Sequence, residues 1–313
     1  MPHAKSNEDW LKDRLVDLLA WAKRVEAISP SSFQEYRYHT ALKLAALAHA
    51  IDVFSTVART YVDQGRFTSS VFIDLFAGSG INAIDPEHHL AGSSVIAAEV
   101  KRTFDRIVSV EADSGKAKVL SKRLRMAGVN HYKVITGDCN ERIADALKTA
   151  GGKRSLVFLC VDPEGMEARW ETIQRASSKY GAMDVFVNMT HGAERELGAV
   201  RSLGRQSPAL ENLMGLPLSK ILLDDSGTAS ALYQSQIQNV LGRNVGGSSI
   251  IRGMNNQPVY TIMLFTRTTK GDSPYNEGYK AMHRRLSTLT VNHVVGALND
   301  IDGRGLFGVG SSS

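Results

Sequence analysis

The stretch Val71-Phe-Ile-Asp-Leu-Phe-Ala-Gly-Ser-Gly80 decides how the rest of the chain is interpreted. Its first half is a β-branched and aromatic run, which is typical of a strand buried in a parallel sheet. Its second half is a turn in which glycines let the backbone approach a ligand closely. The stretch therefore predicts a strand over residues 70–76 that ends at a binding turn. The residues of this turn that we expect to bind a ligand are Asp74, Phe76, Gly78 and Gly80.

After this stretch, short apolar runs alternate with segments of helical periodicity. The expected strands are 106–111, 132–136, 155–161 and 184–189, and the expected helices are 93–102, 114–127, 140–150 and 167–179. Repeated strand–helix units predict an α/β fold with a doubly wound, mostly parallel sheet. Beyond residue 190 we expect a helix over 228–241, strands over 248–252 and 258–267, and one terminal helix over 277–298.

Two helices are expected before the sheet, over residues 8–28 and 33–61, because Ser29-Pro-Ser-Ser interrupts their apolar periodicity. The expected parts of the chain are a helical lid over residues 1–65, the main α/β domain over 66–300, and a disordered tail over 301–313.

The composition excludes several classes of protein. With 43% hydrophobic residues and a net charge of only +5 over 313 residues, the chain is an ordinary globular one. Cys139 and Cys160 are too few for a disulfide framework and lack zinc-ligand spacing, so no metal site is expected. The apolar stretch 42–57 contains Lys43 and Asp52, so we expect no membrane span. The first residues form no basic-then-apolar leader, so we expect a cytoplasmic protein.

Polar side chains also follow the next three predicted strands. They are Glu111 after the second strand, Asp138, Cys139 and Asn140 after the third, and Asp162 and Glu164 after the fourth. An acid at Glu111 is placed to accept hydrogen bonds from both hydroxyls of a ribose, and Asp138 can accept one from an adenine amino group. Because the carboxyl ends of parallel strands face one edge of the sheet, we expect all four loops to line one crevice.

This order of features resembles the class I methyltransferases that use S-adenosylmethionine. Asp74-Leu-Phe-Ala-Gly-Ser-Gly80 is similar to their first motif, Glu111 to the acid after their second strand, and Asp138 to the acid on the adenine side. The resemblance implies a Rossmann-like methyltransferase domain, with the N-terminal helices as a lid and S-adenosyl-L-methionine as cofactor.

A nicotinamide-dependent oxidoreductase is the alternative that Gly78-x-Gly80-x-x-Ala83 leaves open. Two features weigh against NAD(P). Asp74 lies where a dinucleotide fold has an apolar strand residue, and Glu111 comes 33 residues after Gly78 instead of about 20. The next helix begins only after Gly92, so a pyrophosphate would lack the helix N-terminus that binds it.

With its flanks included, the chain resembles the three-Cys-motif partner (TcmP) family of methyltransferase-like proteins. The matching motifs are Tyr38-His-Thr-x-x-Lys43, Phe72-Ile-Asp-Leu-Phe-Ala-Gly-x-Gly80, Gly92-Ser-Ser, Gly137-Asp-Cys-Asn140, Val157-Phe-Leu-x-Val-Asp-Pro-x-Gly165 and Val259-Tyr-Thr-Ile-Met-Leu-Phe265. The chain departs from the family at Ser79, where we expect proline, and at Glu164, where we expect phenylalanine. The resemblance implies a cysteine-motif protein as partner and carries over no reaction.

Candidates for catalysis follow the fourth and fifth strands. Asp162 and Glu164 could act as a base and as a metal or substrate ligand, and His191 as a base or substrate contact. Lys43 lies one helical turn after His39. Lys43 either pairs with the carboxylate of the cofactor, if this helix caps it, or is solvated together with His39.

A basic run leaves the acceptor open between nucleic acid and protein. Its members are Lys101, Arg102, Arg106, Lys116, Lys118, Lys122, Arg123 and Arg125. They are numerous enough to meet phosphates, but no aromatic residues are interleaved as a stacking platform would require. We therefore interpret the chain as an S-adenosylmethionine-dependent methyltransferase of unassigned acceptor. The alternatives are a non-catalytic partner protein with this fold and, more weakly, an NAD(P)-dependent oxidoreductase.

Overall fold

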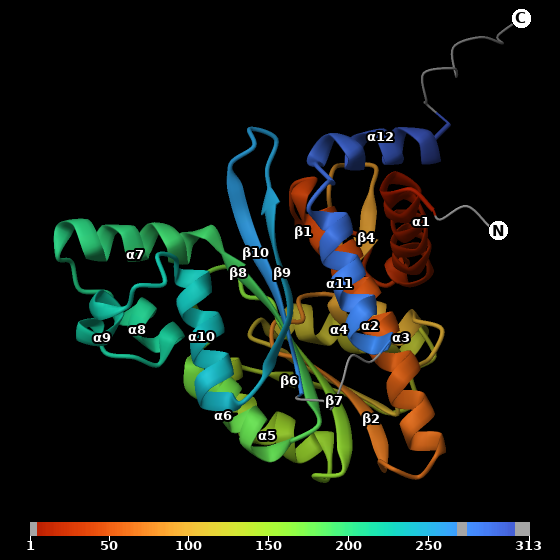
Figure 1. The fold of residues 1–313 in the computed structure, drawn as a ribbon. Helices are drawn as coiled ribbons and strands as arrows, with labels where there is room; N and C mark the ends of the chain where they lie inside the picture. The colour runs from red at the N-terminus through yellow and green to blue at the C-terminus, as the bar shows by residue number, and fades with distance from the viewer. Residues whose placement is uncertain (1–4, 268–273, 304–313) are drawn as a thin grey trace, which may run out of the picture.

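A seven-stranded sheet forms the centre of the fold in the computed structural model, which describes residues 5–267 and 274–303 (Figure 1). Its strands, in their order across the sheet, are β6 (Tyr132–Thr136), β5 (Arg106–Glu111), β2 (Ser69–Asp74), β7 (Ser155–Val161), β8 (Met183–Thr190), β10 (Pro258–Thr266) and β9 (Asn244–Arg252). The first five run parallel, whereas β10 and β9 are antiparallel to their neighbours. The predicted doubly wound, mostly parallel sheet is confirmed.

Helices cover both faces of this sheet. One layer contains α1 (Asn7–Glu26), α2 (His39–Asp63), α3 (Ser93–Glu99), α4 (Ser114–Met126), α11 (Pro274–Leu286) and α12 (Val291–Ile301). The other contains α5 (Cys139–Ala150), α6 (Trp170–Lys179), α7 (His191–Leu203), α8 (Pro208–Met214), α9 (Leu218–Leu223) and α10 (Ala229–Leu241). Along β2, Phe72 faces the first layer, and Val71 and Ile73 face the second. Burial on both faces explains why the strand sequence is continuously apolar.

The expected lid helices are a layer of this fold. α1 and α2 share one hydrophobic core with β2 and β7, so the predicted boundary at residue 65 falls between elements that pack together. By length and composition α2 could cross a membrane, but 72% of its most apolar 18-residue window is buried inside the protein. Such burial is typical of the core helix of a globular domain.

A second, three-stranded sheet corrects the expected helix over residues 33–61. β1 (Gln34–Glu35) pairs in parallel with β3 (Ile81–Ala83), which is antiparallel to β4 (His89–Ala91). The helix begins only at His39, because residues 34–35 form backbone hydrogen bonds with β3 instead. We call residues 29–38 the strap, since they connect α1 to α2 across the glycine turn.

The single helix expected over residues 277–298 is in fact two helices. α11 ends at Leu286, where Ser287 and Thr288 donate side-chain hydrogen bonds to the carbonyls of Arg284 and Arg285. Such side-chain bonds compete with the helical ladder. Thr290 and His293 then form a capping box that begins α12. Of the tail expected over 301–313, residues 304–313 lie outside the described part of the chain.

A buried carboxyl group in β8 gives the fold a pH dependence. Asp184 is 1% exposed and accepts a hydrogen bond of 3.0 Å from the Tyr279 hydroxyl, and burial raises its pKa to about 7. Between the unfolded pKa of about 3.9 and this value, the folded chain holds more protons at Asp184 than the unfolded chain does. The contribution of Asp184 to stability is therefore present at pH 4 and lost as the pH rises towards 7.

We predict that Asp184→Asn abolishes this part of the pH dependence. The difference in unfolding free energy between wild type and variant should change with pH by at most about 1.4 kcal/mol per unit between pH 5 and 7. Urea unfolding of both proteins across this range measures it. Asp74, whose pKa burial raises to about 6, is present in both proteins and cancels in the difference. Parallel stability profiles would contradict the prediction.

Candidate functional site

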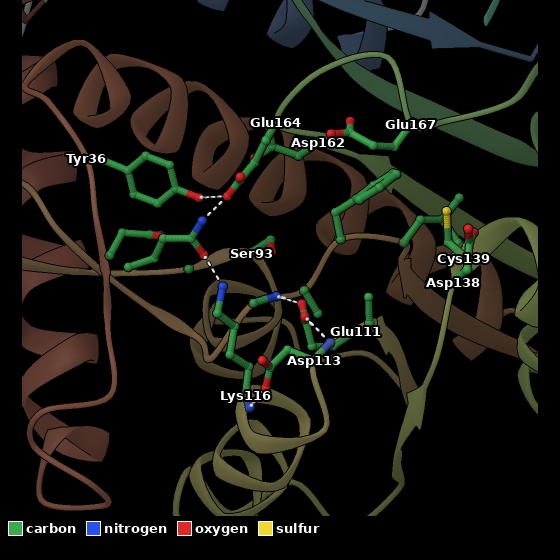
Figure 2. A pocket seen from close by; sticks show the side chains of 18 of the residues that line it. Tyr36, Ser93, Glu111, Asp113, Lys116, Asp138, Cys139, Asp162, Glu164 and Glu167 are labelled. Atoms are coloured by element: carbon green, nitrogen blue, oxygen red, sulfur yellow. Dashed lines mark hydrogen bonds between the residues drawn. The ribbon is translucent and has the colours of Figure 1, made fainter. Parts of the chain in front are cut away.

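A cavity of about 400 Å³ lies at the carboxyl ends of β2, β5, β6 and β7 (Figure 2). The loops after these four strands all contribute to its lining, as the sequence predicted. Its volume is within the range of small-molecule sites, about 300–1,000 Å³. In this sheet the strand order reverses between β2 and β7, and ligands bind at such a switch point in open α/β folds.

The structure brings most of the predicted site residues into this lining. Those that line the cavity are Lys43, Phe76, Gly78, Glu111, Asp138, Cys139, Asp162 and Glu164. Asp74, Gly80, Asn140 and His191 are not part of its lining. The cavity therefore contains the predicted acids of the second, third and fourth strand ends.

Glu111 holds the glycine turn in place. One of its carboxylate oxygens accepts a hydrogen bond of 2.7 Å from the backbone N–H of Gly78, and the other accepts one of 2.8 Å from that of Asp113 (Figure 2). Gly78 has a φ of +60°, and a Cβ added there would meet only Gln34 Oε1, at 4.0 Å. The turn thus needs glycine for its conformation and leaves space above it for a ligand.

Asp74 and Gly80 lie outside the cavity lining and contact the helices that pack behind the glycine turn. Asp74 is fully buried and accepts hydrogen bonds of 2.5 and 2.7 Å from the hydroxyls of Ser93 and Ser94, at the start of α3. A Cβ at Gly80 would come within 2.9 Å of Val95 and Leu120, so glycine is required where α3 and α4 pack. Neither residue lines the cavity, so the structure does not confirm that they bind a ligand directly; their contacts instead hold the turn and place Ser93 in the lining.

The loop after β6 combines a helix cap with an apolar wall. Asp138 caps α5 and accepts hydrogen bonds of 2.7 and 2.8 Å from the backbone and side-chain nitrogens of Asn140. Asn140 in turn donates a 2.8 Å hydrogen bond to the carbonyl of Glu167, which ties α5 to the loop after β7. Burial raises the pKa of Cys139 to about 12, so this thiol stays protonated. Cys139 therefore forms part of the cavity wall and is not a nucleophile.

A buried ion pair joins α2 to the end of β7. The ammonium of Lys43 lies 3.0 and 2.7 Å from the two carboxylate oxygens of Asp162, and the side chains are 6% and 13% exposed. Burial acts to lower the pKa of Lys43, but the Asp162 carboxylate outweighs it and the pKa is raised. The expectation that Lys43 is solvated is therefore wrong, and the side chain lines the cavity while it is paired with a protein carboxylate.

Two site residues on the strap were missed because they lie within the expected helix. The side-chain oxygen of Gln34 accepts a hydrogen bond of 3.1 Å from Lys116, and its amide nitrogen donates to Glu164 (Figure 2). The Tyr36 hydroxyl donates to Glu164 at 3.4 Å. Burial, together with the charges of Asp162 and Glu164, raises the pKa of Tyr36, so it remains a donor. The strap thus connects opposite sides of the cavity, and a two-residue strand gives no periodicity that could reveal this.

Two further expectations are resolved by burial. His191 is the first residue of α7 and is half-buried. It lines neither this cavity nor the smaller cavity that adjoins it at Asp162. Within the basic run, Arg123 is fully buried and donates a 2.8 Å hydrogen bond to the carbonyl of Ser79, and Lys116 lines the cavity. The run is therefore not one continuous solvated face.

No family model matches the chain, and no curated protein matches its sequence. Among solved structures, an O-methyltransferase from Bacillus cereus in complex with SAH is 12% identical, with 79% of this chain and 98% of the other covered and a TM-score of 0.38. A putative O-methyltransferase from Klebsiella pneumoniae is 10% identical, with coverages of 68% and 80% and a TM-score of 0.38. TYW2 of M. jannaschii in complex with AdoMet is 10% identical, with coverages of 67% and 76% and a TM-score of 0.32.

Identities this low concern the fold alone, and at TM-scores below 0.5 these likenesses say nothing of ligand or reaction. The resemblance to the TcmP family likewise rests on the quoted motifs, since no family model matches.

We predict that Lys43→Met destabilises the fold by about 3 kcal/mol, because it leaves the Asp162 carboxylate buried without its cation. In the double variant Lys43→Met/Asp162→Asn the residue at 162 is neutral and can still accept from Asn188, so at least about 1 kcal/mol should be recovered. Urea unfolding of the wild type and both variants measures this. A double variant less stable than Lys43→Met would refute the assignment of the loss to an unpaired charge.

Proposed function

We propose that the chain is an S-adenosylmethionine-dependent methyltransferase whose cofactor binds in the 400 Å³ cavity. The observation that carries this proposal is the charge of the lining. Six carboxylates line the cavity, those of Glu111, Asp113, Asp138, Asp162, Glu164 and Glu167, against the two ammonium groups of Lys43 and Lys116. Such a lining favours a cationic ligand, and this cofactor carries both a sulfonium and an ammonium group.

The residues present fit the parts of this cofactor. Each oxygen of Glu111 accepts one backbone hydrogen bond and keeps a lone pair for a ribose hydroxyl. Asp138 can accept from an adenine amino group, beside apolar contacts from Cys139 and Leu75. Lys43 has a third N–H left for the carboxylate of the cofactor. When bound, the cofactor supplies an electrophilic methyl group.

The same lining argues against the NAD(P)-dependent alternative. A pyrophosphate needs N–H groups at a helix N-terminus or basic side chains. Here the hairpin of β3 and β4 separates the glycine turn from α3, which has only seven residues. The excess of carboxylates in the lining would also repel the two negative charges of the NAD(P) pyrophosphate.

A non-catalytic partner protein with this fold is the other alternative. The position of Asp162 favours an enzyme, because this carboxylate lines both the cavity and an adjoining smaller chamber. Methyl transfer requires the acceptor and the donor to be aligned within one enclosed space. Two chambers that meet at one fixed carboxylate provide that arrangement, and a pure docking scaffold has no need of it.

We predict that the protein binds S-adenosylhomocysteine, and that Glu111→Ala weakens this binding by about 10- to 100-fold, since buried ribose hydroxyls then lose their acceptor. Isothermal calorimetry measures the affinity. The matched control is Glu141→Ala, which removes an exposed acid from the first turn of α5 and should leave the affinity unchanged. Thermal unfolding without ligand checks that Glu111→Ala is folded.

Binding of NADH in place of S-adenosylhomocysteine would overturn the proposed function. Equal affinity of the wild type and Glu111→Ala for S-adenosylhomocysteine would remove Glu111 from the site. A cysteine-motif protein as partner, which the TcmP resemblance implies, is part of the same proposal.

A further inference from the structure

A second cavity, of about 260 Å³, adjoins the first at Asp162, and we call it the side chamber. Its lining shares Gln34, Tyr36, Lys43, Asp162 and Glu164 with the larger cavity. It is otherwise distinguished by Glu35, Asn188 and Tyr260. Its volume is just below the range of sites that enclose a whole small molecule. The side chamber is therefore suited to the end of a larger molecule, such as one side chain.

Asn188 in β8 lines this chamber, and its side chain carries an unused acceptor. The residue is 1% exposed, and its amide nitrogen donates a hydrogen bond of 2.8 Å to Asp162 Oδ1. This bond fixes the amide orientation, because the reverse placement would set the amide oxygen against the carboxylate. The amide oxygen is buried and has no hydrogen-bond partner among the described residues. Such an oxygen is satisfied when a ligand N–H donates to it.

The chamber offers acceptors and negative charge. Its lining contains three carboxylates, those of Glu35, Asp162 and Glu164, against the single ammonium of Lys43. Of the roughly four lone-pair positions of Asp162, three are used by Lys43 and Asn188, which leaves one at Oδ2. A group with several N–H donors and a positive charge complements this wall.

Aromatic rings form another part of the wall. The Lys43 ammonium lies 5.5 Å from the ring centre of Tyr36 and 5.2 Å from that of Tyr260. Faces of tyrosine rings attract cations, so the rings that already stabilise one ammonium add to the preference of the carboxylates for a second.

We propose that the side chamber binds the methyl acceptor, and that this acceptor is a primary amine at the end of an alkyl chain, as on a protein side chain. Asn188 Oδ1 is the residue atom that recognises its N–H. This inference rests on the proposed function, because the methyl group must come from the neighbouring cavity. A nucleobase is less well matched, since Glu35 and Glu164 would repel the phosphates that accompany it.

The chemistry balances with the residues present. The bound ammonium first loses one proton to the Glu164 carboxylate, which is exposed and can pass it to water. The nitrogen lone pair then forms the N–CH₃ bond while the S–CH₃ bond breaks and its electron pair stays on sulfur. The products are a methylammonium group and a thioether. Asn188 and Asp162 hold the nitrogen in line throughout, which is the main contribution an enzyme makes to such a displacement.

The test measures binding of n-butylammonium by saturation-transfer NMR, with n-butanol and butyrate as probes of equal length. We expect n-butylammonium to bind with a Kd on the order of millimolar, as suits so small a ligand, and butyrate not to bind. Asn188→Ala should weaken n-butylammonium at least fivefold, and Asn239→Ala, an exposed asparagine of α10, should not change it. Unchanged affinity for S-adenosylhomocysteine in Asn188→Ala would show that the larger cavity is intact.

A second variant covers the case in which Asn188→Ala does not fold. Glu35 is exposed, so Glu35→Gln should fold normally and weaken n-butylammonium two- to threefold without affecting n-butanol. Equal binding of n-butylammonium to the wild type and both variants would overturn the inference. So would Asn188-dependent binding of cytidine in its place. Because the probes are measured with and without S-adenosylhomocysteine, failure of that ligand to bind refutes the proposed function separately.

Discussion

The ion pair between Lys43 and Asp162 is the interaction on which the arrangement of the site depends. Lys43 comes from the middle of the helical layer and Asp162 from the carboxyl end of β7, so the pair fixes α2 over the sheet edge. Two charges removed from water are costly, and their mutual attraction offsets this only where geometry is good. Here Asn188 provides a further hydrogen bond, and two tyrosine rings lie within 5.5 Å of the ammonium. The same pair lines both the cavity and the side chamber, so the place where the two cavities meet is also a tie between α2 and the sheet.

Strand positions and strand ends could be predicted because their signals are local. β5, β6 and β7 have the residue bounds expected from the sequence, and the acids after them line one cavity. A parallel sheet buried on both faces needs continuous apolar runs, and its geometry gathers the following loops. These two constraints are sufficient to locate the site without any knowledge of side-chain contacts.

The contacts of the strap and the break before α12 could not be predicted in the same way. Gln34 and Tyr36 reach the cavity because two residues pair with β3, and a segment this short has no period to detect. Asn188 lies inside a strand, where a polar residue is ordinarily explained by local pairing, and only its unpaired oxygen beside Asp162 sets it apart. Conversely, Asp74 and Gly80 belong to a recognisable motif and yet act through the packing of α3 and α4.

The net charge of the whole chain and the charge of its two cavities differ in sign. The whole molecule carries +5, which taken alone favours an anionic partner. Both the cavity and the side chamber nevertheless have more carboxylates than ammonium groups. In the basic run, Arg123 is buried and donates its hydrogen bond to the carbonyl of Ser79 in the glycine turn. A ligand inside a low-dielectric cavity responds to the charges within a few ångströms, since exposed charges beyond about 10 Å are screened by salt. The local balance therefore outweighs the global one, and it favours a cation in the cavity as well as in the side chamber.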